Sequence, residues 1–128
     1  MTSELTSLTW VVALNAVMWM PYVINTVMVR GLMDAVGYPE EPKALSGWAT
    51  KMKAAHYNAV ENLVVFAALV LIANAAGVSN DVTVMAAKVY FWARVVHLIS
   101  YTMAIPWVRT LSFTVGWVCQ IAIILQLL

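Results

Sequence analysis

The sequence predicts an all-α integral membrane protein, a bundle of four transmembrane helices, and two observations carry that prediction. Of the 128 residues, 63% are hydrophobic and only 10% are charged, whereas about a quarter of the residues of a soluble domain are charged. The apolar residues also fall into four stretches, each near the roughly 20 residues that a helix needs to cross about 30 Å of hydrocarbon. The alternating pattern of membrane β-strands is absent.

The first two spans are separated by a long polar segment. We expect the first span at about 5–29, where Arg30 and Gly31 end it. The connection that follows holds two prolines, several acidic residues and lysines. The second span is expected at about 52–76, and Gly77 is a candidate for its C-terminal cap because glycine adopts the left-handed conformation easily. This hairpin therefore has a large connection outside the membrane.

The last two spans are predicted to form a tighter hairpin. The residues 79–81 (Ser-Asn-Asp) make a short turn and supply N-cap candidates for a third span at about 82–104. Pro106 ends this helix because proline lacks the N–H that a helix interior needs. The fourth span is expected at about 107–128. The chain 1–128 is thus predicted to be a single four-helix membrane domain.

The distribution of basic residues predicts how the helices cross the membrane. The first and third connections hold most of the basic residues near span ends, namely Arg30, Lys43, Lys51, Lys53 and Arg109. The opposite side offers only Lys88 and the N-terminal amine. Because positive charge near span ends marks the cytoplasmic side, we expect these two connections in the cytoplasm and both termini outside. In a bacterium, the membrane that the helices cross is expected to be the inner membrane. The net charge of +1 and the lack of a basic patch give no indication of nucleic-acid binding.

Polar side chains recur at helical spacing inside the second and third spans. Asn58 and Glu61 are three residues apart and share one helix face. Arg94, His97 and Tyr101 form a second stripe at spacings of three and four residues. Charged groups at membrane depth cost roughly 2.5–3.5 kcal/mol each and indicate a functional site by default. The structural alternative is that Glu61 pairs with Arg94 and joins the two helices.

The count of charges favours a ligand over that pairing. Three arginines, Arg30, Arg94 and Arg109, stand against a single carboxylate that we expect inside the membrane, Glu61. Surplus guanidinium groups suit a ligand with several carboxylates, because arginine binds carboxylates in a bidentate manner. The sequence therefore predicts a site for a small polyanion that is reached from the cytoplasm.

Other candidate residues indicate packing rather than chemistry. His56 and Glu61 are five residues apart and lie off one face, so we predict no metal site. Cys119, the only cysteine, lies in an apolar stretch where thiols are usually inert. A single cysteine also excludes an intrachain disulfide.

Four segments of the chain resemble the MAPEG family, the membrane-associated proteins of eicosanoid and glutathione metabolism. The residues 55–62 (AHYNAVEN) are similar to the family's second-helix signature, and 93–101 (ARVVHLISY) to its third-helix signature. The residues 106–110 (PWVRT) resemble its entry into the fourth helix, and Arg30 followed by Pro39-Glu40 resembles the end of its first helix. The resemblance covers nearly the whole chain, and the length is most similar to the compact bacterial members.

This resemblance implies an assembly and an activity. It implies a homotrimer that binds glutathione, a co-substrate, between subunits near the cytoplasmic side. It further implies a membrane-bound glutathione-dependent transferase or peroxidase that acts on lipophilic electrophiles, with membrane lipids and a lipophilic second substrate as further partners. The alternative is a non-catalytic lipid-binding or scaffolding subunit that retains the pocket.

The resemblance also assigns roles to individual residues. The positions that match glutathione-contacting positions of the family are Arg30, Asn58, Glu61, Arg94, His97 and Tyr101. Glu61 would meet the amino group of the γ-glutamyl moiety, whereas Arg109 and Thr110 would stabilise the thiolate and are the expected catalytic residues. Tyr57 stands where well-known members carry an arginine, and Phe113 where several carry a tyrosine. These departures predict a weaker affinity for glutathione or a different native thiol.

Overall fold

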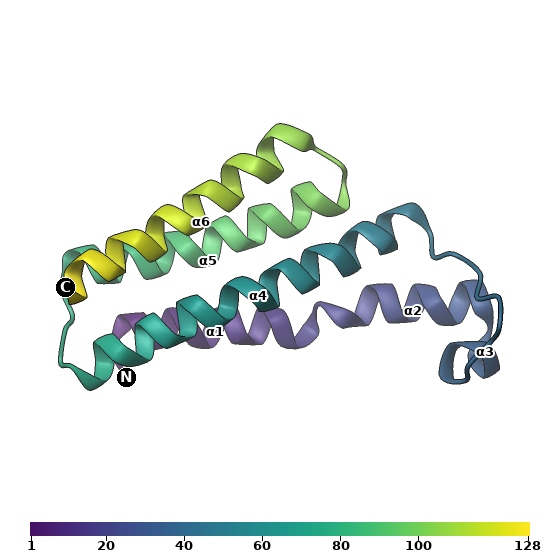
Figure 1. Cartoon of the computed structure of the whole chain (residues 1–128), viewed down its shortest axis with the longest axis horizontal. Coiled ribbons are helices and arrows are strands. Elements are labelled where there is room, and N and C mark those ends of the chain that lie inside the picture. Colours follow the sequence, from purple (N-terminus) through teal and green to yellow (C-terminus); the bar gives the residue numbers. More distant parts are fainter.

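The computed structural model describes all 128 residues and contains only helices. Their bounds are α1 (Ser3–Val17), α2 (Trp19–Arg30), α3 (Leu32–Val36), α4 (Gly47–Ala75), α5 (Asp81–Thr102) and α6 (Pro106–Leu127). Four stretches are long and apolar enough to cross a membrane: α1 with α2, α4, α5 and α6. The chain is therefore an all-helical integral membrane protein with the four expected spans, which run up and down as two hairpins (Figure 1).

The first span is divided into two helices at Met18. α1 ends at Val17 and α2 begins at Trp19. Pro21 explains the interruption, because its nitrogen cannot donate to the carbonyl of Val17 and its ring clashes with that carbonyl. The two helices still follow one another in nearly the same direction (Figure 1).

The second span begins at Gly47, earlier than the expected residue 52. Ser46, the residue before this helix, is held by Asn25 of α2: the Asn25 amide donates to the Ser46 hydroxyl at 2.9 Å, and the Ser46 N–H donates to Asn25 Oδ1 at 3.0 Å. This tertiary anchor fixes the start of α4, and it extends the helix into a segment that composition alone marks as a loop.

The connection between α4 and α5 has the caps that the sequence predicts. Gly77 adopts φ +70°, and the N–H of Val78 donates to the carbonyl of Ala73 at 2.9 Å, as in a Schellman turn. Asn80 then caps α5 through a reciprocal capping box with Thr83. The helix ends on both sides of this turn are therefore capped.

The connection between α5 and α6 has the same hydrogen-bond pattern, but the residue in the left-handed conformation is not a glycine. The N–H of Ile105 donates to the carbonyl of Ser100 at 2.8 Å, and Ala104 occupies the left-handed position with φ +58°. A side chain in this conformation costs roughly 1–2 kcal/mol. Pro106 is the first residue of α6, where a missing N–H is tolerated.

The core lies between α1, α4, α5 and α6. Phe66 of α4 stacks on Tyr90 of α5 with ring centroids 3.9 Å apart, and Val11, Val70 and Ile123 pack around this pair. α2 is different, because it contacts α1, α3 and α4 but neither α5 nor α6.

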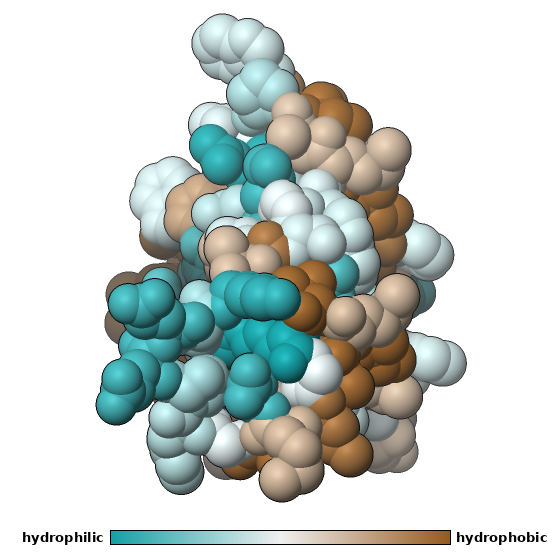
Figure 2. Space-filling view, turned by 90° about the vertical axis from the view of Figure 1, so that its right-hand side faces the viewer, coloured by the Kyte–Doolittle hydropathy of each residue, from teal (hydrophilic) through white to brown (hydrophobic).

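The bundle has two ends that are distinguished by what they carry. The α2–α4 and α5–α6 connections lie at one end, and both termini lie near the other (Figure 1). Figure 2 looks onto the end with these two connections, where hydrophilic residues gather in the lower part, and Figure 1 places α3 and the loop to α4 there. We call this the arginine end, because Arg30 and Arg109 lie there, and the other the terminal end.

Candidate functional site

A buried arginine with no carboxylate partner is the centre of the site. Arg94 of α5 is 3% exposed. Its Nη2 donates to Asn58 Oδ1 at 2.7 Å and lies 3.3 Å from His97 Nδ1, while its Nε has no hydrogen-bond partner. A buried guanidinium that meets only neutral groups is incompletely compensated.

A ladder of amides holds the acceptor of this arginine in place. Asn62 Nδ2 donates to the backbone carbonyl of Asn58 at 2.9 Å. Gln120, which is buried on α6, donates in turn to the backbone carbonyl of Asn62 at 3.2 Å. The polar contacts therefore run from α6 through α4 to α5. Gln120 had no sequence signal, because it is a lone polar residue in an apolar stretch.

The stripe on α5 continues from Arg94 toward the arginine end. His97 is buried, and its ring lies 5.6 Å from the ring of Tyr101 and 6.2 Å from that of Phe113. The guanidinium of Arg109 lies over the Tyr101 ring at 4.9 Å, within the range of a cation–π contact. The structure thus brings together the predicted residues of α5 and the arginine of α6.

A small cavity opens beside Arg109. It has a volume of about 230 Å³ and is lined by Lys51, Tyr101, Ala104, Ile105, Pro106 and Arg109. Two cationic side chains and one phenol face this space, so it suits an anionic or nucleophilic group. Lys51 was not among the predicted site residues, since the sequence gives no reason to separate it from the other lysines of the loop. Thr110 does not line the cavity, and its hydroxyl donates to the carbonyl of Pro106 at 3.2 Å.

Two predicted site residues form no hydrogen bond or ion pair with this cluster within one chain. Glu61 is exposed on α4 and forms no ion pair with Arg94, so the proposed structural pairing of these residues is wrong. Arg30 donates through Nε to the carbonyl of Lys43 at 2.7 Å. Because α2 contacts neither α5 nor α6, Arg30 is separated from Arg94 and Arg109.

A second carboxylate lies inside the bundle, contrary to the sequence-based count. Glu4 of α1 is 3% exposed. Its carboxylate accepts hydrogen bonds from the hydroxyls of Ser79 and Thr83. It lies at the terminal end, so it does not compensate the arginines. The sequence gives no sign that Glu4 is buried, because the apolar stretch begins only at Leu5.

Comparisons with known proteins agree with the resemblance in the motifs. A sequence model of the MAPEG family matches residues 7–128, nearly the whole chain. No curated protein and no solved structure matches the chain.

Proposed function

This chain belongs to the MAPEG family, and we propose that it is a membrane-bound glutathione-dependent transferase or peroxidase that acts on lipophilic electrophiles. The family indicates a membrane function related to glutathione or eicosanoid metabolism. The observation that carries the finer proposal is Arg94, a buried guanidinium whose only polar neighbours are neutral.

Glutathione supplies the groups that this cluster lacks. It carries two carboxylates, one ammonium group and a thiol. A carboxylate beside Arg94 would compensate the buried charge and accept from the Nε that has no partner. The ammonium group would find a carboxylate in Glu61, which has no partner within the chain. His97 and Tyr101 add polar groups without adding negative charge.

The position of Glu61 supports a site between subunits. It lies at the middle of α4 (Gly47–Ala75) and is exposed. A carboxylate that faces lipid at this depth costs about 2.5–3.5 kcal/mol or more, so it is expected to face protein or bound ligand. Arg30 cannot join the cluster of its own chain because α2 does not contact α5. We therefore propose a homotrimer in which a neighbouring copy covers Glu61 and contributes Arg30.

Arg109 is the proposed group for activation of the thiol. A free thiol has a pKa of about 8.5 and is mostly protonated at neutral pH. A guanidinium beside the sulfur favours the thiolate, which is the attacking form. Arg109 lies beside the cavity at the arginine end. Thr110 is the weaker of the two catalytic candidates, because its hydroxyl proton is already donated to Pro106.

An apolar groove between α5 and α6 supports access for a lipophilic substrate from the bilayer. It has a volume of about 360 Å³ and includes Val96, Val108 and Leu111 among its lining residues. Val108 precedes Arg109, so one end of the groove lies close to the proposed thiolate site. We propose that the arginine end faces the cytoplasm of a bacterium, which is the compartment that contains glutathione.

Calorimetry on the detergent-solubilised protein tests glutathione binding directly. We expect wild type and Glu40→Gln to bind with equal affinity, because Glu40 is an exposed loop residue. Glu61→Gln should bind about tenfold more weakly, since a charge-assisted contact of roughly 1.4 kcal/mol is lost. No heat of binding at millimolar glutathione would rule out the proposal.

Complementation tests whether the site lies between copies. Arg30→Gln and Arg94→Met are expressed separately and then together. If a neighbour contributes Arg30, mixed assemblies contain some interfaces with both native arginines, and glutathione binding returns in part. Binding that stays absent in the mixed assemblies contradicts a shared site.

The non-catalytic alternative is favoured by one feature of the site. Phe113 lies 6.2 Å from His97 and offers no hydroxyl near the expected position of the sulfur. Glutathione binding without turnover of a model aryl halide or a lipid hydroperoxide would support this lipid-binding or scaffolding role. Turnover that is lost in Arg109→Gln supports the enzyme.

A further inference from the structure

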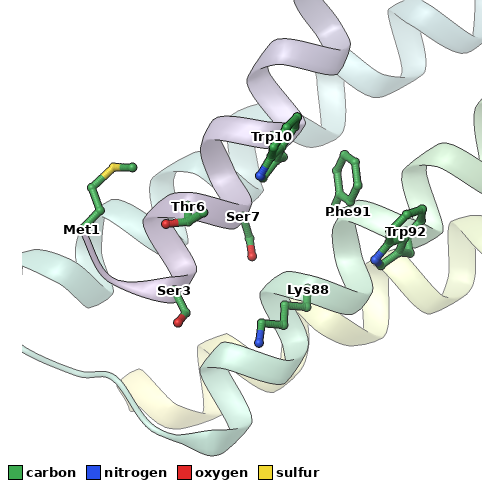
Figure 3. A pocket seen from close by; sticks show the side chains of 8 residues that line it. All are labelled: Met1, Ser3, Thr6, Ser7, Trp10, Lys88, Phe91 and Trp92. Carbon is green, nitrogen blue, oxygen red and sulfur yellow. The ribbon is translucent and has the colours of Figure 1, made fainter.

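We propose that a second site, at the terminal end, binds the phosphodiester headgroup of a membrane phospholipid. The site is a pocket of about 530 Å³ between α1 and α5 (Figure 3). Polar residues line one part of it, and the aromatic side chains of Trp10, Phe91 and Trp92 line the other. None of these residues belongs to the proposed glutathione site, and Trp92 alone also lines the apolar groove between α5 and α6.

The polar part of the pocket has donors without acceptors. Ser7 is buried, and its hydroxyl has no hydrogen bond within the chain. Lys88 is exposed, and its ammonium group has neither a hydrogen bond nor an ion pair. Figure 3 shows both side chains directed into the space between α1 and α5, with Ser3 at its edge. These groups are arranged to donate to an anion.

The acidic residues nearby do not satisfy Lys88. Glu4 directs its carboxylate to Ser79 and Thr83, which donate to it. Asp81 is exposed at the first position of α5. The positive charge of Lys88 therefore remains available to a ligand.

The depth of the pocket matches that of a lipid headgroup. Ser7 lies four residues after the start of α1, and Lys88 seven residues after the start of α5. At 1.5 Å per residue these are about 6 and 10 Å from the helix ends. A lysine at this depth extends its ammonium group toward the interface. The ammonium group of Lys88 therefore reaches the interface, the region between the phosphates of a bilayer and its acyl chains.

The aromatic wall favours a lipid over a free anion. Trp10 and Trp92 are both more than 60% exposed, and the Trp10 and Phe91 rings lie 6.4 Å apart. Tryptophan is enriched at membrane interfaces because its ring is apolar and its N–H is polar. A phospholipid would place its phosphate near Lys88 and its glycerol and acyl chains along these rings. A free anion would use the lysine but not the rings.

Native mass spectrometry of the detergent-solubilised protein with added phosphatidylglycerol tests this site. We expect Lys88→Gln to weaken binding about fivefold, the effect of roughly 1 kcal/mol per basic residue near a membrane surface. Ser7→Ala should weaken it less. Lys43→Gln, an exposed lysine in the loop at the arginine end, is the matched control and should bind like wild type. Diacylglycerol with the same chains lacks the phosphate, so its weaker binding should not respond to Lys88→Gln.

Three results would overturn the proposal. The first is equal binding of phosphatidylglycerol to wild type and Lys88→Gln. The second is displacement of the lipid by millimolar inorganic phosphate, which would identify a site for free anions. The third is efficient disulfide cross-linking between copies through Trp92→Cys, which would show that a second copy covers the pocket.

Discussion

The α4–α5 and α5–α6 connections have the same backbone geometry, but a different residue occupies the left-handed position in each. In the turn between α4 and α5, at the terminal end, Gly77 takes the left-handed position. In the turn between α5 and α6, at the arginine end, Ala104 takes it. Ala104 also lines the cavity beside Arg109. The strained backbone therefore lies at the proposed glutathione site, as is common for functional sites.

The two buried charged residues, Glu4 and Arg94, also differ in how well their surroundings compensate the charge. Glu4 at the terminal end accepts hydrogen bonds from two hydroxyls. Arg94, from which the cluster extends toward the arginine end, meets only neutral groups and keeps an unpartnered Nε. We infer that the hydrogen bonds of Glu4 raise the free energy of unfolding, whereas the incompletely compensated Arg94 lowers it and serves to bind a ligand.

Replacement of Arg94 by methionine should have the largest effect on binding. We expect Arg94→Met to weaken glutathione binding about a hundredfold, since the loss of one partner of a buried charge pair costs roughly 3 kcal/mol. Thermal unfolding without ligand should occur at the same temperature or higher, because an apolar side chain removes a poorly compensated buried charge. Calorimetry and thermal unfolding measure the two quantities. Unfolding of the variant would instead assign Arg94 a structural role.

Replacement of Glu4 should have the opposite pattern. Glu4→Ala removes a buried carboxylate that accepts from the hydroxyls of Ser79 and Thr83, so we expect about 2 kcal/mol lower stability, although Thr83 keeps the carbonyl of Asn80 as an acceptor. Thermal unfolding in detergent measures the loss. Glutathione affinity at a temperature where the variant is folded should match wild type. A change in affinity would show that the two ends are coupled.

Replacement of Gln120 tests the amide ladder. Gln120→Leu removes the donor to the carbonyl of Asn62, which supports the acceptor of Arg94. We expect glutathione binding to weaken several-fold, in line with a net hydrogen bond of about 1 kcal/mol. Gln126→Leu is a control on the same helix, since Gln126 is exposed and bonds to Asn80 at the terminal end. Equal effects of the two substitutions on binding would refute the ladder.

Substitutions at the two turns should have small effects of opposite sign. Ala104→Gly should raise stability by about 1 kcal/mol, and Gly77→Ala should lower it by a similar amount. Thermal unfolding measures both. If Ala104→Gly also changes glutathione turnover, the strained residue contributes to the site, whereas unchanged turnover limits its role to the fold.

The helices and their caps could be predicted because their signals are local. Gly77, Asn80 and Pro106 act on the backbone within one turn, so composition and spacing suffice. The stripe of Arg94 and His97 is a local feature of the same kind. The break near Pro21 also has a local cause, but the apolar pattern continues through it.

The rest of the site depends on how the helices are rotated and which of them touch. The outward direction of Glu61 follows from the packing of α4 on α5. The isolation of Arg30 follows from the absence of contacts between α2 and α5. Gln120 joined the ladder only through contact between α6 and α4. No spacing within a single helix contains this information.

The two hairpins have unequal lengths, with spans of 28 and 29 residues in the first and 22 and 22 in the second. At 1.5 Å per residue, the difference is about 10 Å. Because the hairpins start nearly level at the terminal end (Figure 1), the α5–α6 turn ends short of the C-terminus of α2 and the N-terminus of α4. Arg109 lies next to this turn. In an assembly of several copies, the space beyond each α5–α6 turn would be bordered by the longer helices α2 and α4. A polar molecule would reach this space from the aqueous side, and a lipid from the bilayer.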